Sequence, residues 1–243
     1  MNKGFFPKLA ANNIRKNSKT YIPYLLTCIM TVAVFYIVKS LSLNPGLEKM
    51  VGAQTLMYTM SMGSWVTALF AFIFLFYTNS FLIKRRKREF GVFNILGMEK
   101  RHLAQTMAWE SLYVTLIGLV GGLILGIALD KVMFLVITKA IGGEIALGFF
   151  VSGKAIETTV VFFIIVFFLI FLNTARQIHV ANPIELLKEG HAGEKEPKTK
   201  WLMALLGLAC VGVGYYLALT VENPLTSLLV FFVAVVLVII GTY

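Results

Sequence analysis

The stretch FLIKRRKREFGVFNILGMEKRHL, residues 81–103, decides how this chain is organised. It starts at the end of a long apolar run and continues into five consecutive cations, Lys84, Arg85, Arg86, Lys87 and Arg88. Apolar side chains then recur at three-residue steps, at Phe90, Phe93 and Leu96. This spacing predicts a short amphipathic helix over 88–102 that lies on a surface, either the bilayer interface or a groove on another protein.

The composition is that of an integral membrane protein. The 243 residues are 58% hydrophobic and 14% charged, whereas a soluble domain is about 45–50% apolar and about 25% charged. The net charge of +10 is explained by Lys and Arg in loops on the cytoplasmic side of a membrane. We therefore expect a lipid bilayer around the chain and no nucleic acid.

Six stretches are free of Asp, Glu, Lys and Arg, and most are close to the roughly 20 residues that a spanning helix needs. They cover 21–38, 50–83, 111–129, 158–175, 201–221 and 223–243. The second is too long for one span, and its helix is expected near 58–83. The sequence thus predicts an all-α protein with six transmembrane helices.

The distribution of cations predicts that the N-terminus is cytoplasmic. Segments 1–20, 84–101 and 176–200 hold five, seven and five of the 22 Lys and Arg residues, as the positive-inside rule requires of inner segments. Segment 132–153 contains Lys139, Glu144 and two glycines, and a seventh span there would place 176–200 outside. We interpret it as an interfacial or re-entrant piece.

No catalytic or metal-binding motif is present in the sequence. It contains neither a Walker A loop nor an H-E-x-x-H pair, and its three histidines, His102, His179 and His191, fall in expected loops. Three acidic residues, Glu110, Asp130 and Glu157, fall at the expected ends of spans, where they would serve as boundary residues. We therefore predict no catalytic residue, no metal and no cofactor, so any chemical energy must come from a partner.

Two further patterns point to packing and to a second short helix. Gly118, Gly122 and Gly126 recur at four-residue steps, which lets helix backbones approach closely in lipid. In ANPIELLKEG, residues 181–190, Asn182 is the expected N-cap and Pro183 the first helical residue. Glu185 completes a capping box, and Leu187 belongs to the apolar face.

The chain resembles FtsX-like (MacB-type) ABC transporter permeases in KRRKREFGVFNILGMEKRHL, residues 84–103. NNIRKNSKTYIPYLLTCIMTVAVFYI near the start and NPIELLKEGHAGEKEPK later resemble the bacitracin-export (Bce-type) branch of Gram-positive bacteria. The resemblance implies a multi-pass protein of the bacterial cell membrane with the FtsX-like core in helices 2–4. It implies no enzymatic activity in this chain.

The same resemblance implies a separate ABC ATPase that carries ATP–Mg and drives resistance to cell-wall-directed peptide antibiotics. The ATPase-coupling residues would be Glu89, Phe90, Gly91, Phe93, Leu96, Gly97 and Met98. A sensor histidine kinase is a further implied partner. The alternative is a membrane sensor or scaffold that signals to such a kinase without transport.

Four segments follow from this reading. Residues 1–57 hold an N-terminal amphipathic segment, the first transmembrane helix and an outer loop, and 58–180 hold the permease core. Residues 181–200 form a cytoplasmic linker, and 201–243 hold helices 5 and 6. Because the family has ten helices and a large external domain, we expect this sequence to be the N-terminal part of a longer permease.

Overall fold

The computed structural model describes residues 5–47, 52–95, 98, 100–141, 150–180, 201–220, 230 and 233–238. In this part of the chain all regular structure is helical. The helices are α1 (Phe5–Lys16), α2 (Ser18–Leu41), α3 (Ala53–Ile95), α4 (Lys100–Ile141), α5 (Gly153–Val180) and α7 (Trp201–Leu219).

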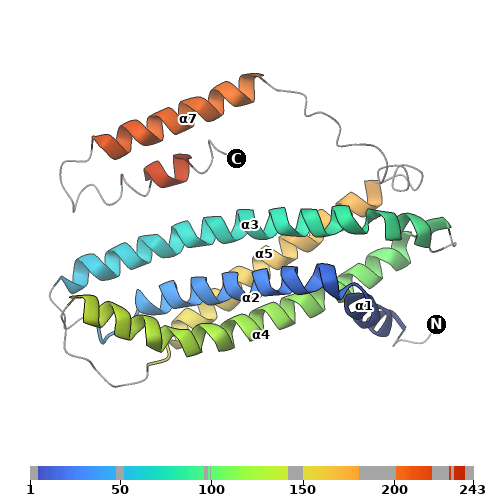
Figure 1. Cartoon of the computed structure of the whole chain (residues 1–243), viewed down its shortest axis with the longest axis horizontal. Helices are drawn as coiled ribbons and strands as arrows, with labels where there is room; N and C mark the ends of the chain where they lie inside the picture. The colour runs from blue at the N-terminus through green and yellow to red at the C-terminus, as the bar shows by residue number, and fades with distance from the viewer. Residues whose placement is uncertain are drawn as a thin grey trace.

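Helix α2 is the centre of the bundle formed by α1 to α5. It packs against α3, α4 and α5, and α1 lies across one end of the bundle against α4 (Figure 1). The main core is built from apolar side chains of α2 to α5, among them Cys28, Leu75, Val114 and Phe163. Aromatic rings tie α2 to α5, since Phe35 stacks on Phe162 with ring centroids 5.0 Å apart.

In the part of the chain that the structure describes, four helices are long and apolar enough to cross a membrane. They lie within 18–41, 53–86, 101–140 and 153–177. Helices α3 and α4 have 43 and 42 residues, so each is about 63–65 Å long at 1.5 Å per residue. The hydrocarbon core of a bilayer is about 30 Å thick. Both helices therefore extend beyond it.

Two predicted element boundaries are wrong. The separate amphipathic helix expected over 88–102 does not form, because α3 continues without a break through the five cations to Ile95. Likewise, 132–141 is the last part of α4 and not a separate interfacial or re-entrant piece. Lys, Arg and Glu are good helix formers, so a change from apolar to charged residues ends the membrane-spanning part without ending the helix.

The predicted fifth and sixth spans are described unequally. Helix α7 coincides with the expected fifth span, and it lies apart from α1 to α5 (Figure 1). Its Gly214 approaches the backbone of Ala234 in the short helical segment 233–238. Most of the expected sixth span, the linker 181–200 and the predicted helix with Asn182, Pro183, Glu185 and Leu187 lie outside the described residues.

Candidate functional site

The basic run at the end of α3 places one of its cations inside the bundle. Lys84 and Arg85 are exposed, whereas Arg86 has only 2% of its surface exposed. Successive residues on an α-helix point about 100° apart, so neighbours in the run face different surroundings. Here the sequence of α3 turns Arg86 toward α2 and α4.

Arg86 forms a buried ion pair with Glu110 of α4. Its two terminal nitrogens contact both carboxylate oxygens, with Nη2 3.2 Å from Oε1. Both side chains are 3% exposed. Removing two charges from water costs several kcal/mol for each ion unless they are paired and fully hydrogen-bonded. The second requirement is met by side chains from α1 and α2.

Tyr21 and Asn13 form further hydrogen bonds with this ion pair. The Tyr21 hydroxyl accepts a hydrogen bond from Arg86 Nη1 and donates one to Glu110 Oε2 at 2.7 Å. The Asn13 side-chain amide donates to Glu110 Oε1 at 3.0 Å. Residues from α1, α2, α3 and α4 thus meet at one carboxylate. We call Asn13, Tyr21, Arg86 and Glu110 the four-helix polar cluster.

Glu89 joins this cluster to the junction between α1 and α2. Its Oε2 accepts from Arg86 Nε at 3.2 Å and from the side-chain amide of Asn17 at 3.1 Å. The Glu89 side chain is 38% exposed. It is therefore reachable from the surface while it contacts a buried group, which is a suitable position for transmitting a displacement inward.

Of the other predicted coupling residues, Phe90 and Gly91 are buried and Met98 is partly buried. Phe90 is 1% exposed and packs in a cluster with Ile83, Leu103 and Met107, against which Met98 also lies. Gly91 is buried, and the neighbouring Val92 is 46% exposed. The expected apolar stripe is thus turned inward at Phe90. The Phe93 side chain and residues Leu96 and Gly97 lie outside the described part.

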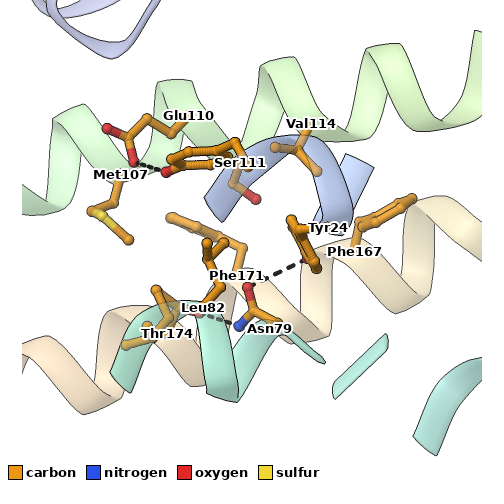
Figure 2. Close-up of a pocket in the computed structure, with 12 residues that line it drawn as sticks. Tyr24, Asn79, Leu82, Met107, Glu110, Ser111, Val114, Phe167, Phe171 and Thr174 are labelled. Atoms are coloured by element: carbon orange, nitrogen blue, oxygen red, sulfur yellow. Dashed lines mark hydrogen bonds between the residues drawn. The ribbon is translucent and has the colours of Figure 1, made fainter. Parts of the chain in front are cut away.

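A small cavity lies beside the four-helix polar cluster, and Figure 2 draws the residues that line it, Glu110 among them. Its volume is about 30 Å³, enough for a water molecule or two. Its polar side is formed by Asn79, which donates to the Thr174 hydroxyl at 2.8 Å and lies 3.4 Å from the Tyr24 hydroxyl. Both Tyr21 and Glu110 line the same cavity.

A family model described as FtsX-like permease C-terminal matches residues 61–183. This match covers half of the chain and includes the whole of α4, most of α3 and all of α5. The chain belongs to the FtsX-like permease family. This permease is accordingly an integral membrane protein, with helices long enough to span a bilayer.

Curated relatives place the permease among ABC transporter permeases. It is 29% identical to the uncharacterized ABC transporter permease YvcS of Bacillus subtilis (strain 168), over 97% of this chain and 36% of the relative. It is 27% identical to the bacitracin export permease protein BceB of Halalkalibacterium halodurans, over 97% of this chain and 38% of that protein. It is also 24% identical to the bacitracin export permease protein BceB of Bacillus subtilis (strain 168), over 87% of this chain and 33% of that protein. The chain therefore spans about a third of the length of the relatives it matches.

The three packing glycines of the permease lie against α2. A Cβ atom added to Gly118 would lie 3.1 Å from Cys28 Cβ, and one added to Gly122 would lie 2.5 Å from Val32 Cβ. One added to Gly126 would lie 3.3 Å from the backbone of Ala33. The distances at Gly118 and Gly126 are tighter than most Cβ contacts, and the distance at Gly122 is shorter than Cβ atoms reach, so Gly122 in particular requires the absence of a Cβ atom at this separation of α2 and α4.

Two carboxylates interpreted as boundary residues are buried instead. Glu110 is in the four-helix polar cluster, and Asp130, 4% exposed, accepts from the Ser40 hydroxyl at 3.0 Å. Glu157 is exposed near the start of α5. The two buried carboxylates lie inside α4 because this helix continues beyond the apolar run at both ends. The polar residues that bind these carboxylates are a Tyr, an Asn and a Ser of α1 and α2. Their presence in those helices was the sequence signal that could have indicated two buried carboxylates.

Proposed function

We propose that the chain is the permease part of an ATP-driven ABC transporter that confers resistance to cell-wall-directed peptide antibiotics. A separate ABC ATPase would bind ATP–Mg and dock at the end of the bundle that carries α1 and the connection from α3 to α4. Membership of the FtsX-like permease family and similarity to bacitracin export permeases support this proposal. The class of antibiotic is proposed by analogy with those relatives.

The observation that carries the coupling part of the proposal is the buried Arg86–Glu110 ion pair. It links the charged extension of α3 to α4, and Tyr21 and Asn13 link the same carboxylate to α2 and α1. A buried pair resists separation because an unpaired charge in the interior is costly. A force on the exposed end of α3 would therefore move four helices together.

The remaining coupling residues lie on or next to a short extension of α3 at the surface, which we call the lever. Residues 87–95 continue α3 beyond its apolar span, about 13 Å at 1.5 Å per residue. Glu89 is half-exposed and touches both Arg86 and Asn17. We place the ATPase contact at Glu89 and Phe93 with the adjoining Leu96, Gly97 and Met98. The buried coupling residues Phe90 and Gly91 belong to the inner side of this lever, where Phe90 packs against α4.

We further propose six membrane-spanning helices with a cytoplasmic N-terminus. Four candidate spans and the apolar helix α7 support the first five, and the concentration of Lys and Arg in 1–20 and 84–101 supports the orientation. In this arrangement the four-helix polar cluster lies at the cytoplasmic ends of α2 to α4. That is the side on which an ABC ATPase hydrolyses ATP.

The proposal is tested by measuring growth in bacitracin when the ABC ATPase is inactive. The permease is expressed with its cognate ABC ATPase, once as wild type and once with the ATPase's catalytic glutamate replaced by glutamine, at equal membrane levels of both subunits. We expect resistance to be lost with the inactive ATPase. Resistance that survives would instead favour a sensor or scaffold that signals to a histidine kinase, and would overturn the transporter proposal.

A further inference from the structure

A second, larger groove lies between α2 and α3, next to the cavity of Figure 2. Its volume is about 130 Å³. Its walls come from one face of each helix and consist of Lys19, Thr20, Pro23, Tyr24 and Thr27 of α2 and Thr78, Phe81, Leu82 and Arg85 of α3. Tyr24 and Leu82 are buried and close its floor, whereas Pro23 and Phe81 are exposed at its rim.

Two cations stand at one end of this groove, and none of the described residues that line it carries a carboxylate. Lys19 and Arg85 are exposed, and neither forms an ion pair with any residue that the structure describes. The Arg85 guanidinium carbon lies 4.5 Å from the centre of the Phe81 ring. This cation–π contact holds the guanidinium over the rim of the groove. The pair is therefore free to bind an anion.

The groove changes from charged to apolar along its length. Helices α2 and α3 run in opposite directions (Figure 1), so Lys19 near the start of α2 and Arg85 near the end of α3 share one end. Thr27 and Thr78 lie about 10–12 Å further along. Their hydroxyls already donate to carbonyl oxygens of their own helices, Pro23 at 2.9 Å and Phe74 at 2.8 Å. Among the described lining residues, the far end thus offers no free donor to a polar ligand.

We propose that this groove binds an anionic glycerophospholipid of the surrounding bilayer, with its headgroup phosphate between Lys19 and Arg85. The cations lie at the ends of apolar spans, which is the depth of lipid phosphates, and basic sites between transmembrane helices are suited to anionic headgroups. An acyl chain would follow the apolar rim past Phe81. With the orientation proposed above, the lipid belongs to the cytoplasmic leaflet.

The test compares lipid retention by the purified protein using native mass spectrometry. Mixed micelles contain equal amounts of phosphatidylglycerol and phosphatidylcholine, and we expect the protein to retain phosphatidylglycerol preferentially. The variant Lys19→Gln/Arg85→Gln should bind phosphatidylglycerol about 25-fold less tightly, since a cation next to the headgroup phosphate contributes about five-fold and this contribution falls off with distance. The control Lys16→Gln/Lys84→Gln removes the same charge from two exposed positions outside the groove.

Equal losses in the two double variants would mean diffuse attraction and would overturn the proposal. Displacement of the lipid by millimolar inorganic phosphate would identify a site for free anions and would also overturn it. If the groove variant is not recovered with the helicity of the wild type, Arg85→Gln alone is measured. A loss of about five-fold there supports the site, and an unchanged preference contradicts it.

Discussion

Gly122 of α4 faces Val32 of α2 at a distance that leaves no room for a side chain. A Cβ atom at Gly122 would lie 2.5 Å from Val32 Cβ and 2.9 Å from the carbonyl oxygen of Ile29. The carbonyl belongs to the backbone and cannot rotate away. The contact between the two central helices therefore depends on the absence of a Cβ atom at this position.

We expect Gly122→Ala to separate α2 from α4 and to lower the thermal unfolding temperature in detergent. Overpacking of a closely packed core costs about 1–3 kcal/mol. Gly212→Ala is the matched control, because a Cβ atom at Gly212 of α7 meets nothing within 4 Å. Its effect should stay within about 0.5 kcal/mol. Equal melting temperatures for the two variants would show that the α2–α4 contact adapts to the extra carbon.

The ion pair between Arg86 and Glu110 gives a second expectation about stability. Either Arg86→Met or Glu110→Met leaves an unpaired buried charge and should destabilise the protein by about 3–5 kcal/mol. The double variant should cost less than the sum of the two single changes. Thermal unfolding of the four proteins measures this coupling. Lys84→Met, an exposed change on the same helix, is the control, and additive effects of the two single changes would contradict a direct interaction.

How much of this arrangement could be predicted differs between residues. The long apolar runs predicted an all-helical membrane protein, and this is confirmed for the described residues, where four helices can span a bilayer. The spacing of Gly118, Gly122 and Gly126 identified a helix face from the sequence, because one helix carries the whole pattern. The helix that packs against this face could not be identified, because no local sequence pattern distinguishes α2 from any other helix.

The four-helix polar cluster could not be predicted for the same reason. Arg86 and Glu110 are 24 positions apart, and Asn13 and Tyr21 come from elements still further away. In the sequence, Arg86 is one of five equivalent cations, and Glu110 follows the aromatic residue Trp109 at the edge of an apolar run. Arg86 and Glu110 are buried because α3 and α4 continue beyond their apolar runs. The charged residues in these extensions pack against α1 and α2.

The contact between Asn79 and Thr174 predicts a smaller loss of stability. Thr174→Val keeps the shape of the side chain but removes the acceptor of the 2.8 Å hydrogen bond from Asn79. Hydrogen bonds between membrane helices contribute about 0.6 kcal/mol on average and up to about 1.7 kcal/mol, and we expect a loss in this range. Thr158→Val is the control on the same helix, since among the described residues its hydroxyl bonds only to the carbonyl oxygen of Lys154. A loss no larger than that of the control would show that water in the cavity replaces the missing acceptor.

Glu89 gives the sharpest test of coupling, because it contacts a buried group while being partly exposed. We expect Glu89→Gln to lower bacitracin resistance and the stimulation of the cognate ATPase by the permease, since the contacts to Arg86 Nε and Asn17 lose their charge. Stability should change by only about 1 kcal/mol or less, as is usual for ion pairs near the surface. Glu157→Gln is the control, because it removes the same charge from an exposed position near the start of α5. Resistance and ATPase stimulation are measured at equal membrane levels of the three proteins. Wild-type values for Glu89→Gln would exclude this residue from the coupling path, whereas equal losses for both variants would assign the effect to charge alone.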